Sequence, residues 1–233
     1  MPVFQPFSSQ HFIALAIGAA LTACLIFAGR QGGRSKQAAT AILILLNLSP
    51  SLMVRLAWSG YPDPGIENRL PLQLCDIAAL VSAFALMSRD RTLCDLTYFW
   101  GLAATTQALL TPALQLGFPS WPFVVFFVQH FAIVATALFL PLADGWRPRI
   151  PWWSSPARAW LWVNVYIVFA MAVNASLGSN FGFASHKPAN PSLLDFLGPW
   201  PWYLLSLQGI ALLLFLLLSL PFLLLRKPKP DGK

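Results

Sequence analysis

The chain has 233 residues, of which 57% are hydrophobic and only 10% are charged, and its formal net charge is +7. Soluble globular domains carry about 25% charged residues, so the composition excludes an ordinary soluble fold and indicates a membrane-embedded protein. The basic residues lie in short connectors between apolar segments and form no amphipathic stripe, which excludes a nucleic-acid-binding surface of the usual kind.

Seven apolar segments follow one another along the chain. Each is long enough to cross the hydrocarbon core of a bilayer, which takes about 20 helical residues. We predict them at 11–29, 38–58, 71–88, 94–112, 121–141, 157–177 and 203–225. The first has no Lys or Arg before it, which is typical of a retained anchor rather than a cleaved signal peptide. The prediction is an all-α, polytopic membrane bundle of seven transmembrane helices, with a single domain over 1–225 and a basic tail over 226–233.

The connectors predict how the bundle is oriented. If the seven segments alternate in direction, one side of the membrane receives twelve basic residues: Arg30, Arg34, Lys36, Arg89, Arg91, Arg147, Arg149, Arg158, Arg226, Lys227, Lys229 and Lys233. The other side receives Arg69 and Lys187, while Arg55 lies within the second segment. Cytoplasmic loops carry the excess of Lys and Arg, so we expect the N-terminus outside and the C-terminus in the cytoplasm.

Several polar residues should gather in the outer half of this bundle. An ionisable side chain within an apolar helix costs about 2.5 to 3.5 kcal/mol on insertion scales, so it normally has a partner or a function. We expect Asp76 to form a structural ion pair with Arg55. The supporting polar cluster that we predict contains His11, Arg55, Gln73, Asp76, Gln107, Gln129 and Asn174. Such residues either bond to one another between helices, at about 0.6 kcal/mol each, or line a cavity.

Cys75 and His130 form the candidate catalytic pair. A thiol becomes a strong nucleophile when a neighbouring base promotes the thiolate, and His is the usual base. The alternative is a packing thiol and a hydrogen-bonded histidine. Counted from the segment starts at 1.5 Å per residue, His130 would lie about 14 Å deep and Cys75 about 7 Å, which separates the two. Cys24 and Cys94 are interpreted as small hydrophobic residues, and no disulfide framework or metal site is predicted.

The loop at 178–202 is rich in Pro, Gly and Trp and should lie on the outer side. Trp200 and Trp202 are candidate interface anchors. His186 and Lys187 are candidate contacts for a lipid headgroup, with simple surface exposure as the alternative.

Four motifs in order resemble one family. They are "LPLQLCD" at 70–76, "YFWGLAATTQALLTP" at 98–112, "FFVQH" at 126–130 and "LLDFLGPWPWYLL" at 193–205. From Ser8 to Leu205 the chain resembles the YwaF-like bacterial integral membrane proteins, which are related to vertebrate transmembrane protein 164. The resemblance implies an acyltransferase that moves a fatty acyl chain between phospholipids with a Cys and a His, here Cys75 and His130. It also implies a bacterial cytoplasmic membrane location and a more distant similarity to androgen-induced-gene and ADTRP lipid hydrolases.

The leading hypothesis is therefore phospholipid acyl transfer through a Cys75 thioester, with His130 as base and membrane phospholipids as partners. Gln73, Gln107 and Gln129 are candidate donors to the oxyanion, and no cofactor, nucleic acid or obligate protein partner is expected. The alternatives are an intramembrane lipid-ester hydrolase and a non-enzymatic seven-helix receptor. The last segment contains no Lys, which argues against a retinal-binding receptor, and the chain has no internal repeat typical of a transporter.

Overall fold

The computed structural model describes residues 3–58 and 65–224, and within these ranges the chain is helical, with no β-strand. An isolated bridge between Val3 and Leu116 ties the N-terminus to a loop. The main helical elements are α1 (Ser9–Arg30), α2 (Gly33–Ala57), α3 (Leu74–Ser88), α4 (Arg91–Trp100), the π-helical turn η2 (Gly101–Thr105), α5 (Thr106–Leu110), α6 (Trp121–Leu142), α7 (Ser154–Leu177) and α8 (Trp202–Leu224). Three short 3-10 turns, η1 (Ile66–Asn68), η3 (Phe181–Phe183) and η4 (Leu193–Phe196), lie in the connectors. The all-α prediction is confirmed.

Each of the seven predicted segments coincides with a helical stretch, although two differ from expectation in detail. The third begins three residues later than predicted, at Leu74, because Gln73 is extended and acts as the N-cap. The fourth is interrupted, since the π-helical turn divides α4 from α5. Among the described residues, four helices are long and apolar enough to cross a membrane, namely α1, α6, α7 and α8.

Local signals explain where the helices next to the polar residues begin. The Ser120 hydroxyl accepts a hydrogen bond from the backbone N–H of Phe123, and Pro122 occupies the first turn of α6. Asp90 caps α4 by accepting from Thr92 N at 2.9 Å and Leu93 N at 3.0 Å. These caps satisfy backbone donors that would otherwise have no partner at the helix ends.

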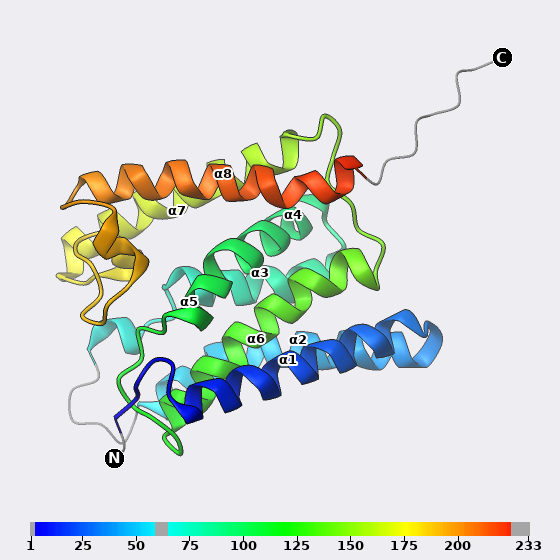
Figure 1. The fold of residues 1–233 in the computed structure, drawn as a ribbon, viewed down its shortest axis with the longest axis horizontal. Helices are drawn as coiled ribbons and strands as arrows, with labels where there is room; N and C mark the ends of the chain where they lie inside the picture. Colours follow the sequence, from blue (N-terminus) through cyan, green and yellow to red (C-terminus); the bar gives the residue numbers. More distant parts are fainter. Residues whose placement is uncertain (1–2, 59–64, 225–233) are drawn as a thin grey trace.

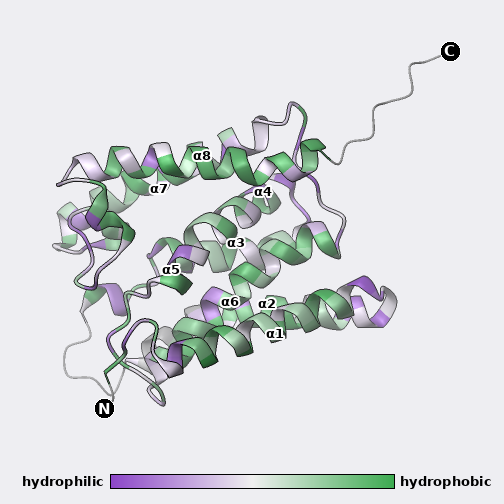
Figure 2. Ribbon diagram, viewed as in Figure 1, coloured by the Kyte–Doolittle hydropathy of each residue, from purple (hydrophilic) through white to green (hydrophobic). Residues whose placement is uncertain are grey.

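Helix α6 is the centre of the bundle. It contacts α1, α2, α3 and α4, and 67% of its apolar window is buried, compared with 11% to 22% for α1, α7 and α8. Glycine lets α1 approach closely, because a Cβ at Gly18 would lie 2.2 Å from the ring of Phe131. The outer helices α1, α7 and α8 are strongly apolar (Figure 2), and most of their residues are not buried inside the bundle, which suits contact with lipid tails.

Charge is unequal at the two ends of the bundle. Figure 1 shows the α1–α2 turn and the 143–153 link at one end, and residues 3–8 with the 178–201 segment at the other. At the first end Asp144 forms ion pairs with Lys36 at 2.8 Å and Arg89 at 2.6 Å. Arg149 lies 3.4 Å from the buried carboxylate of Asp95 at this end. The helices therefore alternate in direction and gather the basic connectors on one side.

Candidate functional site

A buried hydrogen bond joins α3 to α6. The Asp76 Oδ1 atom accepts from Gln129 Nε2 at 2.7 Å, and Oδ2 accepts from the backbone N–H of Gln73 at 3.0 Å. Asp76 and Gln129 are only 8% and 7% exposed. Because both carboxylate oxygens act as acceptors, the arrangement suits the ionised form of Asp76. The second bond also caps the start of α3, so one carboxylate fixes both a helix end and a helix pair.

The same bond sets the levels of Cys75 and His130. Cys75 directly precedes Asp76, and His130 directly follows Gln129. A helix rises 1.5 Å per residue, so each lies within about 1.5 Å of the level of the bond along its own helix. The expected difference in depth assumed a helix from residue 71, whereas α3 begins at Leu74 after the extended Gln73, so that count understates the depth of Cys75. The two candidate residues therefore lie at similar levels along α3 and α6.

Cys75 lies in the first turn of α3 and is partly buried. It packs against a cluster that includes Ala78, Ala79 and, from α6, Ile133. The hydroxyl of Thr105 lies beside the thiol. Among the described residues, no hydrogen bond joins the Cys75 thiol directly to the His130 ring. The thiol is thus a reduced, free cysteine at a helix N-terminus with a hydroxyl beside it.

His130 presents one free ring nitrogen. Its side chain is 5% exposed, and Nδ1 lies 2.7 Å from the carbonyl oxygen of Phe126. A carbonyl only accepts, so the Nδ1 atom must carry the proton in this bond. In the neutral ring Nε2 then has a lone pair, and no described residue hydrogen-bonds to it. The ring also stacks on Phe126, with centroids 4.0 Å apart. A fixed tautomer with an unpaired nitrogen is the form that a general base requires.

His11 is bonded quite differently. Its Nδ1 atom accepts from the backbone N–H of Phe7 at 2.9 Å, so its Nε2 atom must donate to the carbonyl oxygen of Leu109 at 2.8 Å. The ring is fully buried and lies among the rings of Phe4 and Phe127. Both nitrogens are used, so His11 ties the start of α1 to α5 and has no free group for chemistry.

The other predicted cluster residues lie in separate places. Gln107 donates to the Thr111 hydroxyl at 3.0 Å, one turn away on its own segment. Asn174 lies in the last turn of α7 and holds η3, accepting from Phe181 N at 2.8 Å and donating to Phe181 O at 3.1 Å. The Arg55 side chain lies outside the described part of the structure, so its pairing with Asp76 stays a prediction.

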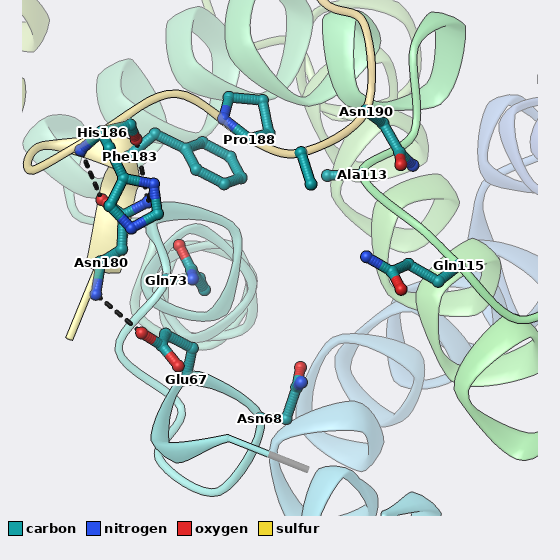
Figure 3. Close-up of a pocket in the computed structure, with 11 residues that line it drawn as sticks. Glu67, Asn68, Gln73, Ala113, Gln115, Asn180, Phe183, His186, Pro188 and Asn190 are labelled. Atoms are coloured by element: carbon teal, nitrogen blue, oxygen red, sulfur yellow. Dashed lines mark hydrogen bonds between the residues drawn. The ribbon is translucent and has the colours of Figure 1, made fainter.

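A polar cavity of about 310 Å³ opens at the end of the bundle, next to the start of α3 (Figure 3). Gln73, which caps α3, and His186, from the long loop, both line it. The Gln73 Oε1 atom accepts from the Gly182 backbone N–H at 3.0 Å. Lys187 is not among the described lining residues, and its Nζ atom lies 5.7 Å from the centre of the Tyr203 ring. The two predicted headgroup residues therefore point to different surroundings.

Two residues that lie near the thiol were not predicted from the sequence. Thr105 ends the π-helical turn, is 1% exposed, and reaches Cys75 from the α4–α5 segment. Tyr166 of α7 donates to the carbonyl oxygen of Leu72 at 3.1 Å and so supports the entry into α3. The motif at 98–112 contains Thr105, but a π-helical turn changes which residues share a face, and an α-helical pattern therefore does not place it.

Within the described ranges, no group of three or more His, Cys, Asp or Glu side chains is arranged to hold a metal ion. Comparison with curated proteins and with solved structures gave no match. The sequence profile of the TMEM164 family matches residues 6–219, which covers the described helices almost completely. The chain belongs to the TMEM164 family of membrane proteins.

Proposed function

We propose that this protein is an integral membrane acyltransferase that moves a fatty acyl chain between phospholipids through a thioester on Cys75. The observation that carries the proposal is the hydrogen bond between Asp76 and Gln129, because it joins α3 to α6 near the level of Cys75 and His130. The unpaired Nε2 atom of His130 supports the role of base. Family membership and the resemblance to the YwaF-like proteins and transmembrane protein 164 support the same reaction.

The reaction divides into two transfers. In the first, His130 Nε2 takes the proton of the Cys75 thiol, and the sulfur attacks the ester carbonyl carbon of the donor lipid. The carbon–oxygen ester bond breaks, the imidazolium returns the proton to the departing lipid oxygen, and an acyl thioester remains. In the second, a hydroxyl of the acceptor lipid gives its proton to Nε2 and attacks the thioester. The carbon–sulfur bond then breaks, and the thiolate recovers the proton from His130.

The residues around the pair have positioning roles in this proposal. The helix N-terminus beside Cys75 supplies partial positive charge, which stabilises a developing thiolate. The Thr105 hydroxyl lies beside the sulfur and would position it from the neighbouring segment. Asp76 and Gln129 keep the two helices at a common level, and Phe126 fixes the tautomer of His130.

We further propose the full membrane arrangement: seven spans, the N-terminus outside, and the C-terminus in the cytoplasm of a bacterial cell. The gathering of basic connectors at one end of the bundle supports this orientation. The site then lies toward the outer leaflet, from which the lipid substrates would enter. Labelling of cysteines introduced at Gly32 and Ser192 with an impermeant reagent would test it, since only the latter should react in intact cells.

Hydrolysis of the same thioester is the second candidate reaction. The observation that favours it is the polar cavity, because Gln73 lines it and lies two residues before Cys75. Water would then replace the acceptor lipid. The products separate the two reactions, because hydrolysis releases a free fatty acid and transfer gives a newly acylated lipid.

The test uses purified protein in vesicles that contain a donor phospholipid with a labelled acyl chain and an acceptor lysophospholipid. We expect label on the acceptor and a hydroxylamine-sensitive adduct on Cys75. Cys75→Ala should abolish both, and His130→Ala should slow them by about 100-fold or more. Cys24→Ser is the matched control, because Cys24 is an exposed free cysteine. Full turnover by Cys75→Ala would refute the proposal, and lipid binding without turnover in the parent would favour a receptor.

A further inference from the structure

The polar cavity next to α3 has a distinctive composition. It lies between η1, the loop before α6 and the long loop after α7, and Figure 3 shows Gln115 across the cavity from Glu67 and Asn180. Its described lining carries one carboxylate, Glu67, and neither Lys nor Arg. This lining does not favour a group that binds chiefly through negative charge, because the described lining residues include no Lys or Arg to balance the anion and His186 is the one side chain among them that could carry a positive charge.

Hydrogen bonds within the protein leave particular lining atoms free. The Glu67 Oε1 atom accepts from Asn180 N at 2.7 Å, and no described residue bonds to Oε2. Asn190 donates through Nδ2 to the carbonyl oxygens of Pro112 and Leu114, which leaves its Oδ1 atom as an acceptor. The free acceptors of the lining therefore come from at least two separate segments of the chain.

Free donors lie beside these acceptors. Gln73 uses Oε1 to accept from Gly182 N, so its amide NH₂ group is available. Gln115 is exposed, and its side chain has no partner among the described residues, so it offers a donor and an acceptor. An ammonium group only donates and a phosphate at neutral pH mainly accepts, whereas a hydroxyl does both. The mixed lining matches hydroxyl groups.

We propose that this cavity binds the hydroxyl-rich headgroup of a membrane lipid, such as a glycerol or a sugar, and so selects the substrate of the Cys75 site. The inference rests on the proposed lipid acyl transfer. Gln73 links the two sites, since it lines the cavity and is also the N-cap of α3, two residues before Cys75. A headgroup held here would leave the glycerol esters of the same lipid next to the start of α3. The ring of Phe183 supplies an apolar wall.

Binding is measured on the full chain carrying Cys75→Ala, in nanodiscs of phosphatidylcholine, so that the readout does not depend on turnover. Dioctanoyl lipids with one shared phosphate are compared by native mass spectrometry: phosphatidylglycerol, phosphatidylethanolamine and phosphatidic acid. We expect the glycerol headgroup to bind about tenfold more tightly than the other two. Free glycerophosphoglycerol, which has the same headgroup but no acyl chains, is the soluble comparison. If it binds as tightly as phosphatidylglycerol, the cavity is a polyol site without a lipid role, and the proposal is overturned.

Two variants test the lining. Gln115→Ala removes a side chain without an internal bond, and Glu67→Gln keeps an oxygen that can accept from Asn180 N, so both should fold normally. Each should lower the preference for the glycerol headgroup by about five- to tenfold, as expected for one or two hydrogen bonds. Arg69→Gln is the control, because this exposed neighbour does not line the cavity and should leave the preference unchanged.

Equal binding of the three lipids, a preference for ethanolamine, or an unchanged preference in both variants would each overturn the headgroup proposal. These outcomes leave the catalytic proposal intact if the parent still transfers acyl chains. Conversely, selective binding with no thioester in the parent would reject catalysis and retain the headgroup site. The two proposals therefore fail independently.

Discussion

The bond between Gln129 and Asp76 can be tested by changing Gln129 to Leu, which replaces the amide with an apolar side chain of similar size. The 2.7 Å bond is lost, and the Asp76 Oδ1 atom is left buried without its donor. Hydrogen bonds to charged groups contribute about 1.5 to 3 kcal/mol, so Gln129→Leu should lower the free energy of unfolding by that amount. Asp76→Ala should cost about 0.5 to 2 kcal/mol more, because it also removes the cap on Gln73 N.

The assay is reversible unfolding in mixed micelles, combined in a double-mutant cycle with Asp76→Ala. Gln208→Leu is the matched control, since the Gln208 Oε1 atom accepts an interhelical bond from Asn164 Nδ2 at 3.0 Å, but both groups are neutral. We expect about 0.6 kcal/mol for this control, which is the average for such bonds in membranes. If Gln129→Leu costs no more than Gln208→Leu, or if the cycle gives no coupling, the bond does not hold α3 and α6 in register.

Three further predictions concern the chemistry and the charge of the site. Thr105→Val keeps the shape of the side chain but removes the hydroxyl beside the thiol, so a thiol-directed lipid electrophile should label Cys75 several-fold more slowly. His130→Ala should slow the same labelling by about 100-fold, and equal rates in parent and variant would show that His130 does not activate the thiol. Asp76→Ala should lower the free energy of unfolding by about 3 to 5 kcal/mol if it leaves the Arg55 charge without a partner in the membrane. In that case the double variant with Arg55→Ala should recover part of the lost expression level and of the lost free energy of unfolding. A double variant with no recovery would count against the ion pair.

Acyl transfer and headgroup selection are assigned to different places because those places differ in burial. Cys75 and His130 lie where water is scarce, so the thioester would be protected and an acceptor lipid favoured over hydrolysis. The polar cavity lies outside the start of α3, where a headgroup can stay hydrated while it is recognised. Acyl transfer and headgroup selection thus take place in neighbouring but different environments, and Gln73 lies between them.

The sequence by itself determined the helical elements. Runs of apolar residues of membrane length predict helices whatever their neighbours are, because backbone groups in lipid must bond within the segment. Connector charges, read along the chain, predicted the end of the bundle at which Lys36 and Arg89 lie. Cys75 and Asp76 also stood out locally, since polar groups in an apolar run are costly.

Only the tertiary structure decided how the polar groups pair. His11 and His130 are similar in sequence, as both are single histidines in apolar helices, yet one uses both ring nitrogens and the other leaves Nε2 free. The structure gave Asp76 an amide partner, Gln129, which no charge pattern indicates. Such pairs depend on the rotation and depth of one helix against another. Those are set by where the chain enters α3 and by the π-helical turn that brings in Thr105, and neither feature follows from the local periodicity of a single segment.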